Sequence, residues 1–354
     1  MKKSQLSLLS CLIIIFVLGL VMIFDTSSAE VLDLHLTKHT WHDLIKQMCY
    51  ALIGALGAFG AYKLGIQKVL SLSPYLLILF SFLLVLTFVP GIGRAINGSH
   101  RWISIMGVSI QPSEFVKYLI PAYFIYSLNQ NDILLRNYLM TLGKIAIPLI
   151  LVLIEPNNGT VAVMTLSLVV LSFVAKIPFK WWGIPLIIAV LSGATFLATL
   201  PYAKGRLNSW LHPELDLKGK GHQPYQAKIA AGSGKVFGKG PGKSLQKLSY
   251  LPEAQNDYIA AIFAEEYGFL GIFSLITLYM FFTFTGFLIV WQIAERDSFL
   301  MCGSIVFLIA FQAFLNLGVV SGLLPSTGLN LPFFSQGGTS LIANATFIGF
   351  LLRE

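Results

Sequence analysis

Long apolar runs constrain this chain more than any other feature of its sequence. Only 11% of the residues are charged while 56% are hydrophobic, a balance that excludes an ordinary soluble domain. A helix that crosses a bilayer needs roughly 20 mostly apolar residues. Ten candidate runs cover about residues 7–24, 44–62, 74–90, 113–128, 141–155, 159–175, 183–200, 264–290, 299–320 and 338–352. We therefore predict an all-α, polytopic membrane protein of about ten transmembrane helices, with residues 1–354 forming a single integral membrane domain.

Lys and Arg in the short connections predict how these helices are oriented, because such residues favour the cytoplasmic side. If ten helices alternate, one side holds Lys2, Lys3, Lys63, Lys68, Arg136, Lys176, Lys180, Arg296 and Arg353. Both termini are then cytoplasmic, and a large extracytoplasmic loop of about residues 201–263 joins spans 7 and 8. This loop carries a net charge of +5. That charge suits an anionic ligand, or else anionic lipid headgroups.

Polar segments rich in Gly and Pro gather on the predicted outer face. They are residues 91–102, 111–114, 155–160, 201–263 and 322–340. Irregular backbone of this kind persists near a membrane only where it is buried in protein or lines a wet cavity. We therefore expect the functional site on the outer face, where ATP is absent and an activated substrate must carry its own leaving group.

Two carboxylates, Glu253 and Asp257, precede the apolar run that begins near residue 259. If Pro252 opens a helix, they share one face of it. A carboxylate at the membrane boundary can serve as a general base, although both could instead only complement a helix N-terminus. Glu265 and Glu266 follow inside the run, and we expect them to face the bundle interior and pair with Lys or Arg.

Gly and Lys alternate through residues 232–243. Backbone amides and the Lys235 and Lys239 side chains of such a loop could cradle a pyrophosphate. A loop that is merely mobile is the alternative interpretation. The Gly-Lys-Ser of residues 242–244 lacks the spacing of a nucleotide-binding P-loop.

Six ordered blocks give the sequence a specific resemblance. They are residues 97–103, 111–114, 155–160, 250–257, 265–268 and 331–338. In this order, and on a scaffold of ten spans, they resemble the signature blocks of the SEDS family, which includes the FtsW, RodA and SpoVE types. Residues 242–254 are more similar to the FtsW branch than to the RodA branch.

The resemblance implies a peptidoglycan glycosyltransferase that polymerises lipid II into glycan strands during septal cell-wall synthesis, with Asp257 as the essential carboxylate. It also implies a class B penicillin-binding transpeptidase as partner, other division-complex membrane proteins, and no nucleic acid. The location implied for the protein is the bacterial cytoplasmic membrane, at the place of cell division. The residues expected to contact the substrate are Arg101, Glu114, Gln226, Lys235, Lys239, Lys247, Glu253 and Ser335. A divalent cation, Mg²⁺ or Mn²⁺, could assist the leaving pyrophosphate.

Three positions depart from the family pattern. Asn157 stands where an Asp is usual, Gln255-Asn256 replaces a His-Thr pair, and Gln336 replaces a Tyr. Two other functions stay open, a lipid II flippase and a noncatalytic scaffold of the division machinery. A flippase predicts a site near the bilayer midplane, whereas the polar segments crowd one face.

Overall fold

The computed structural model describes residues 2–33, 39–96, 99–105, 108–130, 134–199, 205, 210–216, 219, 221–248, 251 and 254–354. Helices dominate these residues. They are α1 (Lys3–Asp33), α2 (His42–Leu64), α3 (Ile66–Leu86), α4 (Ser113–Gln130), α5 (Leu135–Ile154), α6 (Asn158–Val174), α7 (Phe179–Thr199), α9 (His222–Ser233), α10 (Ile259–Trp291), α11 (Arg296–Val320) and α12 (Gly338–Leu351). Each of the ten predicted runs falls on one of them, so the all-α prediction is confirmed.

The surface of the helices is suited to lipid. Within the described ranges, α1, α2, α3, α5, α10 and α11 are long and apolar enough to cross a membrane, and shorter apolar helices lie at 158–174, 179–193 and 338–351. Large side chains such as Phe284 and Met280 on α10 stay 62% and 67% exposed. Exposed apolar surface of this extent needs a hydrocarbon solvent. The chain is therefore an integral membrane protein, while the count of ten spans stays a prediction.

Several helices begin earlier than the apolar runs suggested, among them α3 and α10. Helix α3 starts at Ile66 rather than near residue 74 and contains Pro74 in its interior, which membrane helices tolerate. Gly65 separates it from α2 with a φ of 78°. Helix α10 starts at Ile259 rather than at residue 264, so the loop predicted over 201–263 is shorter at its C-terminal end.

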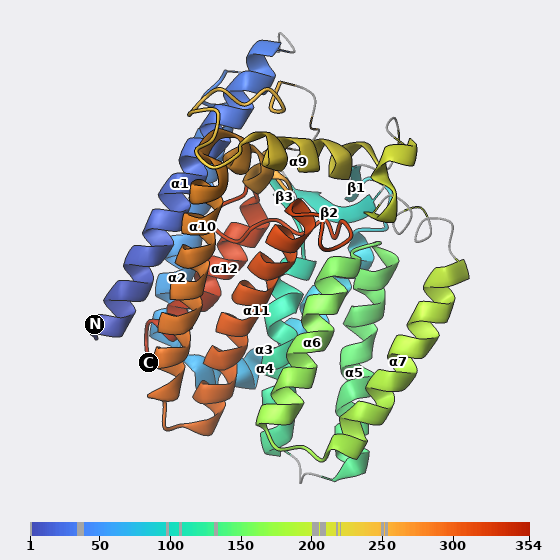
Figure 1. The fold of residues 1–354 in the computed structure, drawn as a ribbon. Coiled ribbons are helices and arrows are strands. Elements are labelled where there is room, and N and C mark those ends of the chain that lie inside the picture. Colours follow the sequence, from blue (N-terminus) through green and yellow to red (C-terminus); the bar gives the residue numbers. More distant parts are fainter. Residues whose placement is uncertain are drawn as a thin grey trace.

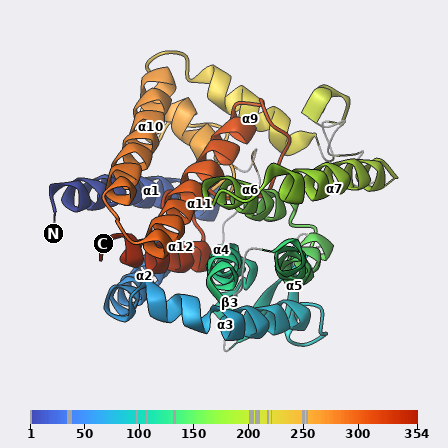
Figure 2. The same cartoon turned by 90° about the horizontal axis from the view of Figure 1, so that it is seen from below.

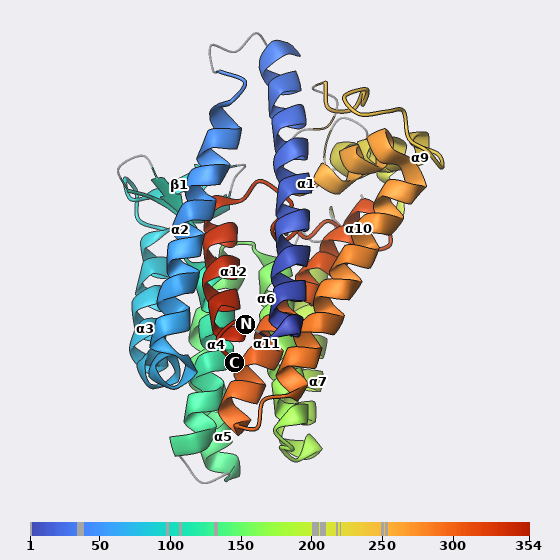
Figure 3. The ribbon, with the colours of Figure 1, turned by 90° about the vertical axis from the view of Figure 1, so that its left-hand side faces the viewer.

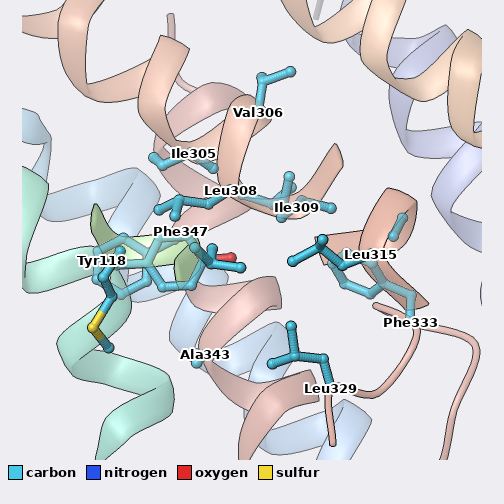
Figure 4. Close-up of a cluster of buried hydrophobic side chains, with 14 of the residues drawn as sticks. Tyr118, Ile305, Val306, Leu308, Ile309, Leu315, Leu329, Phe333, Ala343 and Phe347 are labelled. Atoms are coloured by element: carbon cyan, nitrogen blue, oxygen red, sulfur yellow. The ribbon is translucent and has the colours of Figure 1, made fainter. Parts of the chain in front are cut away.

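The helices pack in pairs. Helix α12 lies along α2, α1 along α10, and α3 along α4 (Figures 2 and 3). The core fills the space between α4, α11 and α12, where the rings of Tyr118 and Phe347 stack with centroids 4.2 Å apart. Ile305 and Ile309 of α11 are buried in the same cluster (Figure 4).

One end of the bundle carries irregular structure, and we call it the capped end. Strands β1 (Gly93–Ile96), β2 (Ser99–Ile105) and β3 (Val108–Ile110) form an antiparallel sheet there in the order β1-β2-β3. Helix α9 lies across the helix ends, and the 3₁₀ helix η1 (Pro213–Asp216) is close to it (Figure 1). Both termini lie near the opposite end of the bundle, and Lys2 Nζ donates to the carbonyl of Glu354 (2.8 Å).

Helix α10 is broken within the capped end. Gly268 has a φ of 67° and a ψ of −162°, which interrupts the helical hydrogen bonds. The loop of residues 235–240 fills the break, since Phe269 N–H donates to Lys235 O (2.8 Å) and Lys239 N–H donates to Glu265 O (2.9 Å). A β-carbon at residue 268 would clash with the backbone of this loop, so glycine is required.

Candidate active site

Asp257 lies in the turn of residues 254–258 that leads into α10, and it is half-buried. Pro252 and Glu253 lie outside the described residues, and so does the predicted face shared by Glu253 and Asp257. The turn corrects the expectation that Asp257 belongs to a helix. The helix starts only after Tyr258, where Ala261 N–H donates to Tyr258 O (2.8 Å).

Arg101 reaches the same region from strand β2. Its side chain is buried, with 8% of the residue exposed. Nε donates to Glu155 O (3.0 Å) and Nη2 donates to Pro156 O (2.6 Å), both in the connection between α5 and α6. These bonds fix the plane of the guanidinium against that connection.

Gly328 lies beside both Arg101 and Asp257. A β-carbon built on this glycine would lie 3.5 Å from Arg101 Nη1 and 3.8 Å from Asp257 Oδ2. The guanidinium and the carboxylate therefore both approach the same point. An acid that can accept a proton thus stands close to a fixed positive charge at the capped end.

Glu155 lies behind Arg101 and is fully buried. Its Oε1 accepts a hydrogen bond from Thr87 Oγ1 (3.0 Å). Burial raises the pKa of the Glu155 carboxyl to about 8, although the hydroxyl of Thr87 and the charge of Arg101 both lower it. Glu155 directly follows the last residue of α5. Because its pKa is raised, its carboxyl group stays largely neutral at pH 7.

The loop of residues 326–337 folds back into the bundle beside Asp257. Asn316 of α11 donates to the carbonyls of Asp257 (2.8 Å) and Leu329 (2.7 Å). Gln312, one turn earlier on α11, donates to the carbonyl of Asn330 (3.0 Å). Sequence reasoning missed both amides. Two polar side chains four residues apart within the apolar run 299–320 were the available signal, since polar groups inside a membrane span are costly.

A second charged group, the α1–α10 ion cluster, lies between those helices and the loop of residues 239–247. Lys247 Nζ contacts Asp25 Oδ1 (2.7 Å) and Glu266 Oε1 (2.8 Å), while Lys239 pairs with Glu265. Glu265 and Glu266 are 0% and 2% exposed. The prediction that these two glutamates face the interior and pair with lysines is confirmed.

The glycine- and lysine-rich loop that contains residues 232–244 donates backbone hydrogen bonds to this cluster. The amides of Gly242 and Ser244 donate to the two oxygens of Glu266 (3.0 and 3.1 Å). Lys235 is exposed and has a φ of 50°. The loop therefore binds anions, and those it binds here are the protein's own carboxylates. Its use for a pyrophosphate stays a prediction.

Three further candidates have contacts of their own within the described residues. Glu114 pairs with Lys117 (2.9 Å) inside the bundle. The hydroxyl of Ser335 accepts from Leu331 N–H (2.8 Å) and shapes the 326–337 loop. Gln226 lies half-buried on α9. Their roles toward a substrate stay predictions.

The convergence of the five predicted polar segments is clear in these contacts. Arg101 of β2 binds the α5–α6 connection, and Gln111 N–H donates to Thr339 Oγ1 (3.1 Å) at the start of α12. Residues far apart in the sequence thus meet at one end of the bundle. Among the described residues, no group of three or more His, Cys, Asp or Glu side chains is arranged to hold a metal ion.

Comparison with known proteins shows the family to which the chain belongs. A family model for the FtsW, RodA and SpoVE proteins, described as "Cell cycle protein", matches residues 5–353. The chain belongs to this family. A relative from Saccharophagus degradans, named a probable peptidoglycan glycosyltransferase FtsW, is 34% identical over 99% of this chain and 92% of its own length. A relative of the same name from Nitrosococcus halophilus is 35% identical, with the same coverage of both chains.

Solved structures of the FtsW, RodA and SpoVE type share the fold. A chain from a peptidoglycan synthase complex that coordinates polymerization and crosslinking matches with a TM-score of 0.79 and 24% identity, over 98% of this chain and 96% of that one. The rod shape determining protein RodA of Thermus thermophilus matches with a TM-score of 0.70 and 24% identity, over 98% and 94% of the two chains. The integral membrane fold is therefore that of this family.

Hydrogen bonds hold three of the residues that depart from the family pattern, although Gln336 takes part only through its main chain and its side-chain Oε1 is buried without a hydrogen-bond partner among the described residues. Asn157 is 1% exposed, and its Oδ1 accepts from Thr160 Oγ1 (2.8 Å). Gln255 Nε2 donates to Glu30 Oε2 (3.1 Å), and Gln336 N–H donates to Gln255 O (2.9 Å). Gln255 and Gln336 are thus joined through their main chains close to Asp257, by a bond that involves neither side chain.

Proposed function

We propose that this chain, a peptidoglycan glycosyltransferase of the FtsW, RodA and SpoVE family, polymerises lipid II at its capped end with Asp257 as the general base. The observation that carries the proposal is the approach of Asp257 Oδ2 and Arg101 Nη1 to the same point beside Gly328. A carboxylate supplies the base for a sugar hydroxyl. A guanidinium supplies the charge that a pyrophosphate leaving group requires.

The reaction is attack by the 4-hydroxyl of an acceptor sugar on the anomeric carbon of a donor sugar. As the new C–O bond forms, Asp257 takes the hydroxyl proton, which contributes on the order of 10²- to 10⁴-fold to the rate. The bond from the anomeric carbon to undecaprenyl pyrophosphate breaks with inversion, and the leaving phosphate keeps the electron pair. Arg101 is held rigidly by two carbonyls, so it offsets this charge without reorganising.

The other predicted cations have weaker geometric support. The ammonium of Lys247 lies between two carboxylates, and that of Lys239 contacts one. Their positive charges are therefore already balanced, whereas exposed Lys235 is placed to meet an incoming anion from solvent. A divalent cation, Mg²⁺ or Mn²⁺, would add further charge at the pyrophosphate.

The expected setting follows from the same proposal. The chain lies in the bacterial cytoplasmic membrane with both termini in the cytoplasm, the capped end outside, and a class B penicillin-binding transpeptidase as partner at the division site. The lysine and arginine pattern of the short loops and the meeting of both termini at the end opposite α9 support this orientation.

A polymerisation assay tests the function. The purified chain and its transpeptidase partner are incubated with lipid II in detergent, and glycan strands are resolved by gel electrophoresis. We expect strands from the wild type, at least about 10²-fold less product from Asp257→Asn, and wild-type product from Glu214→Gln, which removes an exposed carboxylate of η1.

Each alternative outcome has a meaning. Near-normal synthesis by Asp257→Asn rejects the assignment of the base. Absence of strands from the wild type, together with movement of lipid II across reconstituted bilayers, would favour the flippase. Detergent separates these functions because there is no bilayer to cross.

A further inference from the structure

Asn316 joins two non-helical segments beside the proposed catalytic acid. It lies near the end of α11 and is 1% exposed. Its Nδ2 donates to the carbonyl of Asp257, in the turn before α10, and to the carbonyl of Leu329, in the 326–337 loop. One side-chain amide thus connects α11 to both segments.

The orientation of this amide is dictated by its partners. Both are main-chain carbonyls, which can only accept hydrogen bonds, so the NH₂ group must face them. Asn316 Oδ1 then points away, and it is buried without a hydrogen-bond partner among the described residues. A buried acceptor without a partner is destabilising. Asn316 bears this cost in the same orientation that lets its NH₂ group donate to the carbonyls of Asp257 and Leu329.

The two carbonyls belong to the segments that set the distance between acid and guanidinium. Asp257 carries the carboxylate. Leu329 follows Gly328, which lies close to both Asp257 Oδ2 and Arg101 Nη1. Fixing these carbonyls on one amide therefore fixes the main chain of the acid relative to the main chain that both side chains approach.

We infer that Asn316 is a positioning residue that holds the Asp257 carboxylate against Arg101 through the main chain, without itself touching the substrate. The inference rests on the proposed role of Asp257 as general base. Reacting groups displaced by about 1 Å can lose on the order of 10²-fold in rate. Loss of the amide should thus affect the chemical step more than substrate binding.

The chain offers a matched control. Tyr279 of α10 donates from its hydroxyl to Pro332 O (2.6 Å), which belongs to the same 326–337 loop. Tyr279→Phe therefore removes one hydrogen bond to the loop with little change of volume. Unlike the hydrogen bonds of Asn316, the bond from Tyr279 does not involve the turn of Asp257.

The experiment compares Asn316→Leu, Asn316→Asp and Tyr279→Phe in the detergent assay, per mole of monodisperse protein and with its partner. Both Asn316 variants lose the NH₂ group. We expect kcat to fall about 30- to 100-fold with KM within about threefold of wild type, and the acid limb of the pH–rate profile to move. Tyr279→Phe should keep kcat within about threefold and leave the acid limb in place.

The pH profile separates positioning from a merely structural role. A smaller folded fraction lowers the rate equally at every pH and leaves the acid limb unchanged. That result, or a normal kcat in either Asn316 variant, overturns the inference. If Asp257→Asn is inactive while Asn316→Leu is normal, only the positioning role fails. If Asp257→Asn is active, the proposed function itself fails.

Discussion

Two charged centres lie toward the capped end of the molecule and use their cations differently. In the α1–α10 ion cluster, Lys247 is 6% exposed and contacts the carboxylates of Asp25 and Glu266. At the candidate site, Arg101 donates to two main-chain carbonyls, and its guanidinium lies with the carboxylate of half-buried Asp257 beside Gly328. The ion cluster thus joins charged side chains to one another, while Arg101 is oriented by the main chain of the α5–α6 connection.

The largest expected effect is on the stability of the ion cluster. Lys247→Met should leave Asp25 and Glu266 close together without a counter-charge, which costs about 3–5 kcal/mol of unfolding free energy. Thermal unfolding in detergent measures this, with Lys243→Met, an exposed lysine of the same loop, as control. An unchanged melting temperature with a raised KM for lipid II would instead support the predicted substrate contact of Lys247.

The next effect is on catalysis at the candidate site. Arg101→Lys keeps the charge but loses the planar fork that donates to Glu155 O and Pro156 O. We expect kcat to fall about 10²- to 10³-fold with little change in melting temperature. Arg94→Lys, an exposed arginine of strand β1, should behave as wild type. Equal activity of the two variants would remove Arg101 from the mechanism.

A third effect concerns the neutral carboxyl behind Arg101. Burial raises the pKa of Glu155 from 4.5 to about 8 in the folded protein. The folded state therefore holds a proton that the unfolded state releases between these pH values, and stability must fall as pH rises through this window. Glu155→Gln cannot ionise, so it should become more stable than wild type by at least about 2 kcal/mol at pH 8, with no difference near pH 4.5. Parallel melting curves from pH 4.5 to 9 check the sign, and a constant difference would contradict it.

The smallest effect is expected from the exposed edge of the ion cluster. The Lys239 side chain is 32% exposed, and Glu265 also accepts from the hydroxyl of Ser244 and from the amide of Gln246 (3.3 Å). Lys239→Met should cost about 1 kcal/mol or less, because the remaining donors still satisfy the carboxylate. A loss as large as that of Lys247→Met would mean that the two lysines act as one unit, which a double variant would reveal.

The helices could be predicted because long apolar runs have few alternatives in a membrane. Their limits were harder to place. Charge and proline were used as limits, yet α3 continues through Lys68 and Pro74 because a helix satisfies its own backbone groups in lipid. The sheet β1–β3 was not predicted, since its strands are short and lie in a segment rich in glycine.

The site was predictable only in part. Asp257 and Arg101 were named from the sequence, and the fold brings them together. The pairing of Lys247 with Asp25 joins positions 222 residues apart, which no local pattern reveals. Asn316 was missed because one amide within an apolar run is overlooked when the run is scored for hydrophobicity alone.

The break of α10 at Gly268 divides the helix into a part that crosses the membrane and a part that leads from the turn of Asp257. The helix has 33 residues, but the part after the break alone is long enough to cross a hydrocarbon layer of about 30 Å. The part before it leads directly from the turn of Asp257, and the 235–240 loop forms main-chain bonds to both parts, at Glu265 and Glu266 before the break and at Phe269 and Leu270 after it. The loop therefore holds the membrane-crossing part of α10 in a fixed orientation to the part that carries the turn of the acid.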